Sequence, residues 1–147
     1  MRLIFALSVA PVLAATFLAA ADRPDFTGTW RLNAAQSNYP NKNAIPSKLL
    51  KIVEMKGDSL HYTVERELAG KSSRMDLQLT IGETDPYSNV TARWDGSTMV
   101  VELLSTDGVR QIEHWTLEPG GKRLTDHTVV QQPGKAEAAI LRVYEKQ

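Results

Sequence analysis

The stretch that decides the fold is Phe26-Thr27-Gly28-Thr29-Trp30-Arg31-Leu32. Its apolar residues and its glycine occupy every second position, and polar side chains lie between them. Side chains of a β-strand point alternately to the two faces of a sheet, so this period of two predicts a strand with one buried face. Gly28 would leave room for a neighbouring backbone, as isolated strand glycines often do. We expect structural roles for Gly28 and for Trp30, whose indole would close one end of a barrel.

The same alternation recurs along the rest of the chain. Eight further segments show it: Lys48–Lys56, Ser59–Leu68, Ser72–Ile81, Val90–Trp94, Thr98–Ser105, Val109–Leu117, Arg123–Gln131 and Glu137–Glu145. Short turns separate most of them, and Asp95-Gly96 is a strong hairpin signal. Short strands at regular spacing, with no helical period between them, predict an all-β fold. Consecutive hairpins favour an antiparallel up-and-down β-barrel of about eight to ten strands, in which first-to-last pairing removes both exposed edges.

The segment from 33 to 47 departs from this pattern. It is rich in Asn, Ser and Pro, has few apolar residues and shows no helical period, which is typical of a loop. Long ordered loops often carry function, so one interpretation is a flap over the mouth of a cavity. Shortening such a flap would change ligand exchange and leave stability nearly unchanged. The other interpretation is variable surface without a role.

Both ends of the chain resemble a known group of barrels. The motif Phe-x-Gly-x-Trp-x-Leu at residues 26–32 resembles the opening strand of the calycins, which include lipocalins, fatty-acid-binding proteins and avidins. The run from Leu141 to Lys146 closely resembles the terminal strand of intracellular fatty-acid-binding proteins, and Arg93-Trp94-Asp95-Gly96 looks like one of their late hairpins. The chain is therefore similar to a small exported lipocalin-like protein. The helical lid of fatty-acid-binding proteins has no counterpart here.

The resemblance implies a binding role for Arg142 and Tyr144, because in that family an inward Arg-x-Tyr pair holds the ligand carboxylate. Alternation leaves the orientation open: Arg142 and Tyr144 share one face with Ile140, and Leu141 and Val143 share the other. If Arg142 points inward, its guanidinium needs an acidic partner, water or an anionic ligand. No acid lies on its face nearby in its own strand, so a partner would come from another strand or from the ligand. If Arg142 points outward, this strand has no binding role.

The first 21 residues have the pattern of a secretory signal peptide. Met1-Arg2 supplies a positive charge, residues 3–18 are almost wholly apolar, and Ala19-Ala20-Ala21 precedes the polar Asp22. This predicts cleavage after Ala21 and a lipocalin-like domain of residues 22–147 in the periplasm or outside the cell. A retained membrane anchor is the alternative, because the apolar run is nearly long enough to cross a bilayer.

Composition excludes several classes of function. A chain of 147 residues accommodates one domain comfortably. Lys plus Arg and Asp plus Glu both count 17, so the formal charge is zero and nothing favours binding to nucleic acid, or to a membrane after signal cleavage. The chain has no cysteine, which excludes disulfides, thiol catalysis and cysteine metal sites. The oligomeric state is not set by these features.

Catalytic and metal-binding patterns are weak. No Gly-x-Ser-x-Gly motif surrounds a nucleophile, and His61, His114 and His127 lie on three predicted strands without ligand spacing. Asp126 and His127 are neighbours on a strand and so face opposite ways. We predict no catalytic residue, metal or cofactor, and a barrel that binds a small hydrophobic or amphipathic molecule, such as a carboxylate. The alternatives are a structural or protein-interaction barrel with a filled core and, third, a barrel enzyme or a haem or metal binder.

Overall fold

The computed structural model describes residues 23–83 and 89–147. The predicted signal peptide and its cleavage site after Ala21 lie outside the described residues, as does the turn that Asp85-Pro86 predicts. Within the described ranges, the search for a helix long and apolar enough to cross a membrane finds none.

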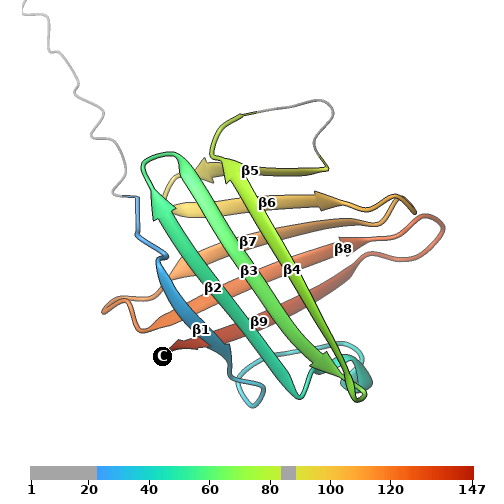
Figure 1. The fold of residues 1–147 in the computed structure, drawn as a ribbon. Coiled ribbons are helices and arrows are strands. Elements are labelled where there is room, and N and C mark those ends of the chain that lie inside the picture. The colour runs from blue at the N-terminus through green and yellow to red at the C-terminus, as the bar shows by residue number, and fades with distance from the viewer. Residues whose placement is uncertain (1–22, 84–88) are drawn as a thin grey trace, which may run out of the picture.

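Nine antiparallel strands form one sheet that curves into a nearly closed barrel (Figure 1). They are β1 (Gly28–Leu32), β2 (Lys48–Lys56), β3 (Ser59–Leu68), β4 (Lys71–Thr80), β5 (Val90–Asp95), β6 (Thr98–Leu104), β7 (Arg110–Leu117), β8 (Arg123–Gln131) and β9 (Ala138–Lys146). Their order in the sheet is β4-β3-β2-β1-β9-β8-β7-β6-β5. This confirms the predicted all-β, up-and-down barrel of about eight to ten strands.

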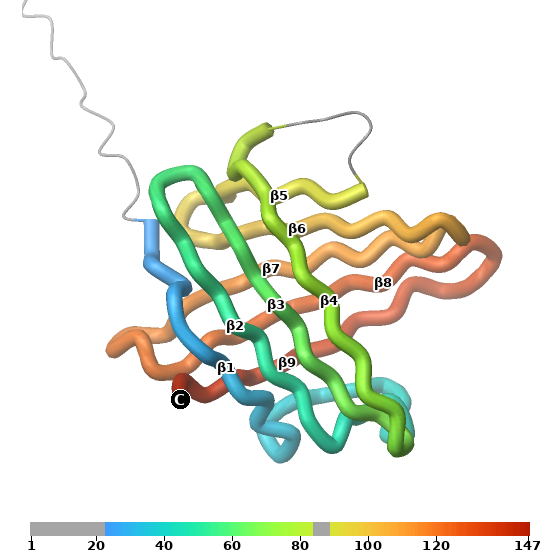
Figure 2. Tube along the Cα trace, viewed as in Figure 1, coloured from blue at the N-terminus to red at the C-terminus, as the bar shows by residue number. Residues whose placement is uncertain are grey.

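The first and last strands pair as predicted, but this pairing does not close the barrel. Trp30 pairs with Lys146 in the middle of the sheet, and β1 lies between β2 and β9 (Figure 2). The two edge strands are β4 and β5, so the expectation that first-to-last pairing removes both edges was wrong. The reason is that β4 and β5 are not joined by a tight hairpin. They are linked near one end, where the Gly82 amide donates to the Ala92 carbonyl at 2.8 Å.

Two-residue turns set the register of several hairpins. Asp95 pairs with Thr98, so Asp95 belongs to β5 and the turn begins at Gly96, which has a φ of 60°. Between β3 and β4, Ala69 and Gly70 have φ values of 50° and 75°. Positive φ at both central residues is the geometry of a type I′ turn, which matches the twist of the flanking strands. Ala69 is the one non-glycine residue with positive φ among those described.

The opening stretch packs deep inside the barrel. Trp30 is fully buried, and its indole Nε1 donates to the Phe26 carbonyl at 2.8 Å. The Phe26 ring meets the ring of Trp115 edge-on, with centroids 5.9 Å apart. A Cβ at Gly28 would lie 2.7 Å from the Cε atom of Lys146. The group that approaches Gly28 is therefore a side chain of the paired strand and not the backbone that the sequence suggested.

Candidate ligand-binding cavity

A cavity of about 400 Å³ lies against the segment 33–47, three residues of which line it. In Figure 1 this segment covers one end of the barrel. Its volume falls in the range of small-molecule sites. Its apolar walls are Ala44, Pro46, Leu49, Val64, Met75 and Ile140. Its polar lining residues are Tyr39, Lys51, Arg66, Ser73, Arg74, Gln111, Glu113, Arg142 and Tyr144.

Charged residues interrupt the inward face of three strands below this cavity. Lys51 on β2 lies between the buried Leu49 and Val53, which share its face. Glu113 on β7 and Asp126 on β8 also lie on the inward faces of their strands, where Glu113 pairs with Thr128 and Asp126 pairs with Trp115. All three side chains are almost wholly inaccessible to solvent. Buried charges of this kind persist only when they are paired and hydrogen-bonded.

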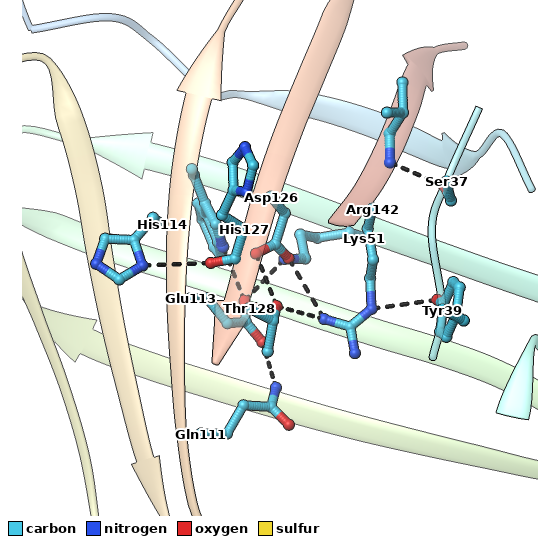
Figure 3. A network of polar contacts seen from close by, with 12 residues as sticks. Ser37, Tyr39, Lys51, Gln111, Glu113, His114, Asp126, His127, Thr128 and Arg142 are labelled. Carbon is cyan, nitrogen blue, oxygen red and sulfur yellow. Dashed lines mark hydrogen bonds and ion pairs between the residues drawn. The ribbon is translucent and has the colours of Figure 1, made fainter. Parts of the chain in front are cut away.

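Lys51 provides that pairing by reaching across the barrel. Its Nζ atom lies 2.9 Å from Glu113 Oε2 and 3.0 Å from Asp126 Oδ2 (Figure 3). The same atom lies 4.1 Å from the centroid of the Trp115 ring, a distance suited to a cation–π contact. Burial alone would lower the pKa of Lys51, but the charges of Asp126 and Glu113 outweigh burial and raise it above its ordinary value. Lys51 is therefore a permanent cation in the interior.

Glu113 is the better satisfied of the two carboxylates. Besides Lys51, the indole Nε1 of Trp115 donates to Oε2 at 2.7 Å, and Gln111 Nε2 donates to Oε1 at 2.7 Å. Burial acts to raise the pKa of Glu113, but the charges of Lys51 and Arg142, together with hydrogen bonds from Lys51 and Trp115, lower it below its usual range. Glu113 is therefore ionised.

Asp126 has fewer donors and a less favourable environment. It accepts hydrogen bonds from Lys51 and from Thr128 Oγ1, the latter at 2.9 Å. Burial raises the pKa of Asp126, and the negative charge of Glu113 adds to this effect, so the pKa is raised even though Lys51 and Arg142 act to lower it. Two neighbouring carboxylates thus have pKa values shifted in opposite directions.

Arg142 points into the barrel, which is the first of the two orientations that its strand allowed. Its Nη1 donates to Thr128 Oγ1 at 2.6 Å and lies 3.7 Å from Asp126 Oδ2. Its Nε donates to the hydroxyl of Tyr39 at 3.2 Å. The acidic partner thus comes from the neighbouring strand β8, as an inward arginine requires. The remaining nitrogen, Nη2, has no hydrogen-bond partner among the described residues.

Tyr144 lies on the same face of β9 and also lines the cavity. Its side chain is 1% exposed, and within the described part of the chain its hydroxyl makes no hydrogen bond. Burial raises the pKa of Tyr144, so the hydroxyl keeps its proton and can donate it in a hydrogen bond. Together with Arg142 Nη2 it offers two donors to an acceptor group in the cavity. The hydroxyl of Tyr62, deeper in the core, is buried and has no hydrogen-bond partner among the residues that the structure describes.

The segment 33–47 covers this end of the barrel. Asn38 exchanges two backbone hydrogen bonds with Leu141 of β9, at 2.7 and 2.9 Å, and Ser37 Oγ accepts from the Val143 amide at 2.9 Å. These contacts bring Tyr39 against Arg142, as Figure 3 shows. The only helical element in the segment as described is the short 3-10 helix η1 (Lys42–Ala44). The segment is thus a covering loop that is partly fixed to β9.

Sequence reasoning missed five residues of this network: Tyr39, Lys51, Glu113, Asp126 and Thr128. A signal existed in the strands, where a polar residue stands on an inward face that is otherwise largely apolar. Asp126 and its neighbour His127 point to opposite faces, as predicted, since Asp126 is buried and His127 is exposed. The three histidines remain outside the network, and no cluster of three metal-ligating side chains occurs in the described ranges.

Comparisons with known proteins support the fold. No family model matches the chain, and no curated protein sequence matches it. Among solved structures, the REP1-NXSQ fatty acid transporter is 17% identical, with 82% of this chain and 95% of that one covered and a TM-score of 0.52. Lipid binding protein 8 of Caenorhabditis elegans is 14% identical, with 83% and 95% covered and a TM-score of 0.54. The chain therefore has the same barrel fold as these two structures, which agrees with the fold that the resemblance at its two ends implied.

Proposed function

We propose that this protein binds a small hydrophobic or amphipathic molecule inside its barrel and that Arg142 and Tyr144 bind its carboxylate. The observation that carries the proposal is a pair of donors on a cavity of about 400 Å³, Arg142 Nη2 and the Tyr144 hydroxyl, neither of which has a hydrogen-bond partner within residues 23–83 and 89–147. Apolar side chains form much of the remaining wall, which suits a hydrocarbon chain. The two similar structures are a fatty acid transporter and a lipid binding protein, which supports this proposal.

The guanidinium of Arg142 is positioned before any ligand arrives. Nε donates a hydrogen bond to Tyr39 and Nη1 donates one to Thr128, so Nη2 is the nitrogen that can donate to a ligand oxygen. A carboxylate would accept one bond from this cation and one from the Tyr144 hydroxyl. Hydrogen bonds that involve a charged group contribute roughly 1.5–3 kcal/mol each. Preorganisation of this kind improves affinity because less side-chain freedom is lost on binding.

The proposal is tested with two ligands that differ only at the head group, laurate and 1-dodecanol, which displace a fluorescent probe of apolar cavities. Arg142→Gln should weaken laurate binding by about ten- to a hundredfold and leave dodecanol binding nearly unchanged. Tyr144→Phe should weaken laurate less. Arg31→Gln is the matched control, because Arg31 is an exposed arginine of β1 and should affect neither ligand.

Two outcomes would contradict the proposal. Equal losses for laurate and dodecanol in Arg142→Gln would mean general damage to packing and would remove the carboxylate site. If neither ligand displaces the probe from the unmodified protein, the ligand-binding proposal fails and the alternative of a structural or interaction module is favoured.

We also propose that the protein is exported to the periplasm or secreted, on the strength of the signal-peptide pattern in residues 1–21. N-terminal sequencing of protein recovered outside the cytoplasm should begin at Asp22. An intact mass that retains residues 1–21 would contradict cleavage and favour an anchor.

A further inference from the structure

The polar cluster below the cavity is electrically balanced when Asp126 is ionised. It contains two cations, Lys51 and Arg142, and two carboxylates, Glu113 and Asp126, and all four side chains are largely or wholly buried. An anionic ligand on Arg142 would add a negative charge to this set. An uncompensated charge in a site that excludes water is costly, and proteins commonly avoid it by taking up or releasing a proton.

Asp126 is the carboxylate that a bound anion would affect most. Its Oδ2 atom lies 3.7 Å from Arg142 Nη1, so it shares that guanidinium with the ligand. Thr128 Oγ1 accepts from Arg142 and donates to Asp126, which links the two groups directly. Glu113 has three donors of its own and does not contact Arg142 within hydrogen-bonding distance. A new negative charge at Arg142 therefore raises the proton affinity of Asp126 more than that of Glu113.

The other ionisable groups around Asp126 keep their charge state in the neutral pH range. Burial raises the pKa values of Tyr62 and Tyr144, so these two hydroxyls stay neutral, and Lys51 and Arg142 stay protonated. His61, His114 and His127 lie on the outer face of the barrel. The groups that face the cluster are Lys51 from β2, Tyr62 from β3, Glu113 from β7, Arg142 and Tyr144 from β9, and Tyr39 from the covering loop.

We propose that binding of a carboxylate at Arg142 is coupled to the uptake of one proton by Asp126, so that the buried cluster remains neutral when the site is filled. This inference rests on the proposed function and specifies how that site is regulated. The complex binds more protons than the free protein, so affinity for a carboxylate falls as pH rises. The fall occurs between the pKa of Asp126 in the free protein and its higher pKa in the complex. Ligand release in a more alkaline medium follows from this coupling.

The first test counts protons in the unmodified protein. Calorimetric titration with laurate, in buffers of equal pH and different ionisation enthalpy, should show uptake approaching one proton per laurate within the window. Between pH 5.5 and 9 the dissociation constant for laurate should rise by up to about tenfold per pH unit through the window, while that for 1-dodecanol stays flat. The carboxyl shift of [1-¹³C]laurate should show that the bound ligand is ionised.

The second test removes the proposed proton acceptor. Asp126→Asn keeps the size of the side chain and leaves the cluster with one excess positive charge, so its laurate affinity should be independent of pH. It should exceed the affinity of the unmodified protein by about tenfold at the alkaline end of the window. Glu65→Gln is the matched control, because Glu65 is a carboxylate outside the cavity lining, paired with Lys48 and Arg74. The laurate affinity of Glu65→Gln should depend on pH in the same way as that of the unmodified protein.

Three results would overturn the inference. The first is that laurate binding takes up no proton, and the second is that the laurate affinity of Asp126→Asn still falls as pH rises. The third is that the bound laurate itself carries the proton. If Asp126→Asn does not fold, as judged by circular dichroism, the proton count and the ¹³C shift of the unmodified protein decide alone. Absence of any binding by laurate and dodecanol is a different failure, because it would refute the proposed function and the coupling with it.

Discussion

At the scale of single residues, Lys51 connects parts of the barrel that the backbone does not join. Its strand, β2, is separated from β7 and β8 in the sheet order, yet its ammonium binds Glu113 and Asp126 on those strands. The contact therefore crosses the interior from one wall to the other, and Figure 1 shows β2 in front of β7 and β8. Buried ion pairs of this type are weak evidence for stability, but breaking one is expensive because the remaining charges stay buried.

Lys51→Met should lower the free energy of unfolding by about 3–5 kcal/mol at pH 7, because it leaves two buried carboxylates without their cation. This loss of unfolding free energy should become smaller as pH falls, since both carboxyl groups can then be protonated in the folded variant. Lys48→Met is the control on the same strand. Its ammonium is exposed and pairs with Glu65, so its loss should cost less than about 1 kcal/mol. If denaturant titrations give the same loss of unfolding free energy for Lys51→Met and Lys48→Met, the interior position of Lys51 has no special role.

Tyr62→Phe should raise stability by about 1 kcal/mol. In the described part of the chain the buried hydroxyl of Tyr62 has no hydrogen-bond partner, and such a group destabilises the folded state. The ring contact with Trp115, whose centroid lies 5.1 Å away, is kept by phenylalanine. Tyr39→Phe provides the contrast, because it removes a bond to Arg142 and should lower stability. A loss of stability in Tyr62→Phe would show that the hydroxyl has a partner, such as an ordered water.

At the scale of elements, the covering loop 33–47 consists of anchored and unanchored parts. Ser37 and Asn38 are hydrogen-bonded to β9, and Tyr39 is 4% exposed. Residues 40–43 are exposed. The prediction that shortening the segment leaves stability unchanged therefore applies to the exposed part alone.

Replacing residues 40–43 by two glycines should change the unfolding free energy by less than about 0.5 kcal/mol and speed the exchange of laurate. Deleting residues 37–39 should cost about 2 kcal/mol or more, because a buried ring and several hydrogen bonds are lost. Thermal unfolding and stopped-flow release of the fluorescent probe measure the two effects. Equal destabilisation by both changes would show that the whole loop is part of the core.

Strand positions were largely predictable from sequence, and the polar cluster was not. Alternation is a local property, so β2, β3 and β8 have the bounds that their patterns predict. The inward position of Lys51 was visible in the same way, between Leu49 and Val53. Its partners were not, because Glu113 and Asp126 lie 62 and 75 residues away and meet it only through the curvature of the sheet. The orientation of Arg142 required the register of β8 against β9, which alternation within one strand cannot give.

At the scale of the whole molecule, aromatic rings fill much of the barrel interior around the polar cluster. Trp30 is fully buried there with Phe26 and Trp115. Trp30→Ala should therefore cost about 3–5 kcal/mol, the usual loss for a large buried aromatic. The exposed Leu104→Ala serves as the comparison and should cost less than about 1 kcal/mol. A shift below 1 kcal/mol for Trp30→Ala in urea denaturation would show that the indole is not a required part of the core.

The pairing of β1 with β9 has a consequence for how the chain folds. Trp30 and Lys146 lie opposite each other although 115 residues separate them in the chain. The hairpins from β2 to β4 and from β5 to β9 can form from nearby residues, but the ladder that unites them must wait for the C-terminal residues. Contacts between distant positions slow folding, because loop-closure entropy is lost before the contacts form. A nascent chain would thus hold two partial sheets with open hydrophobic faces until β9 has been synthesised, and this strand would complete the barrel.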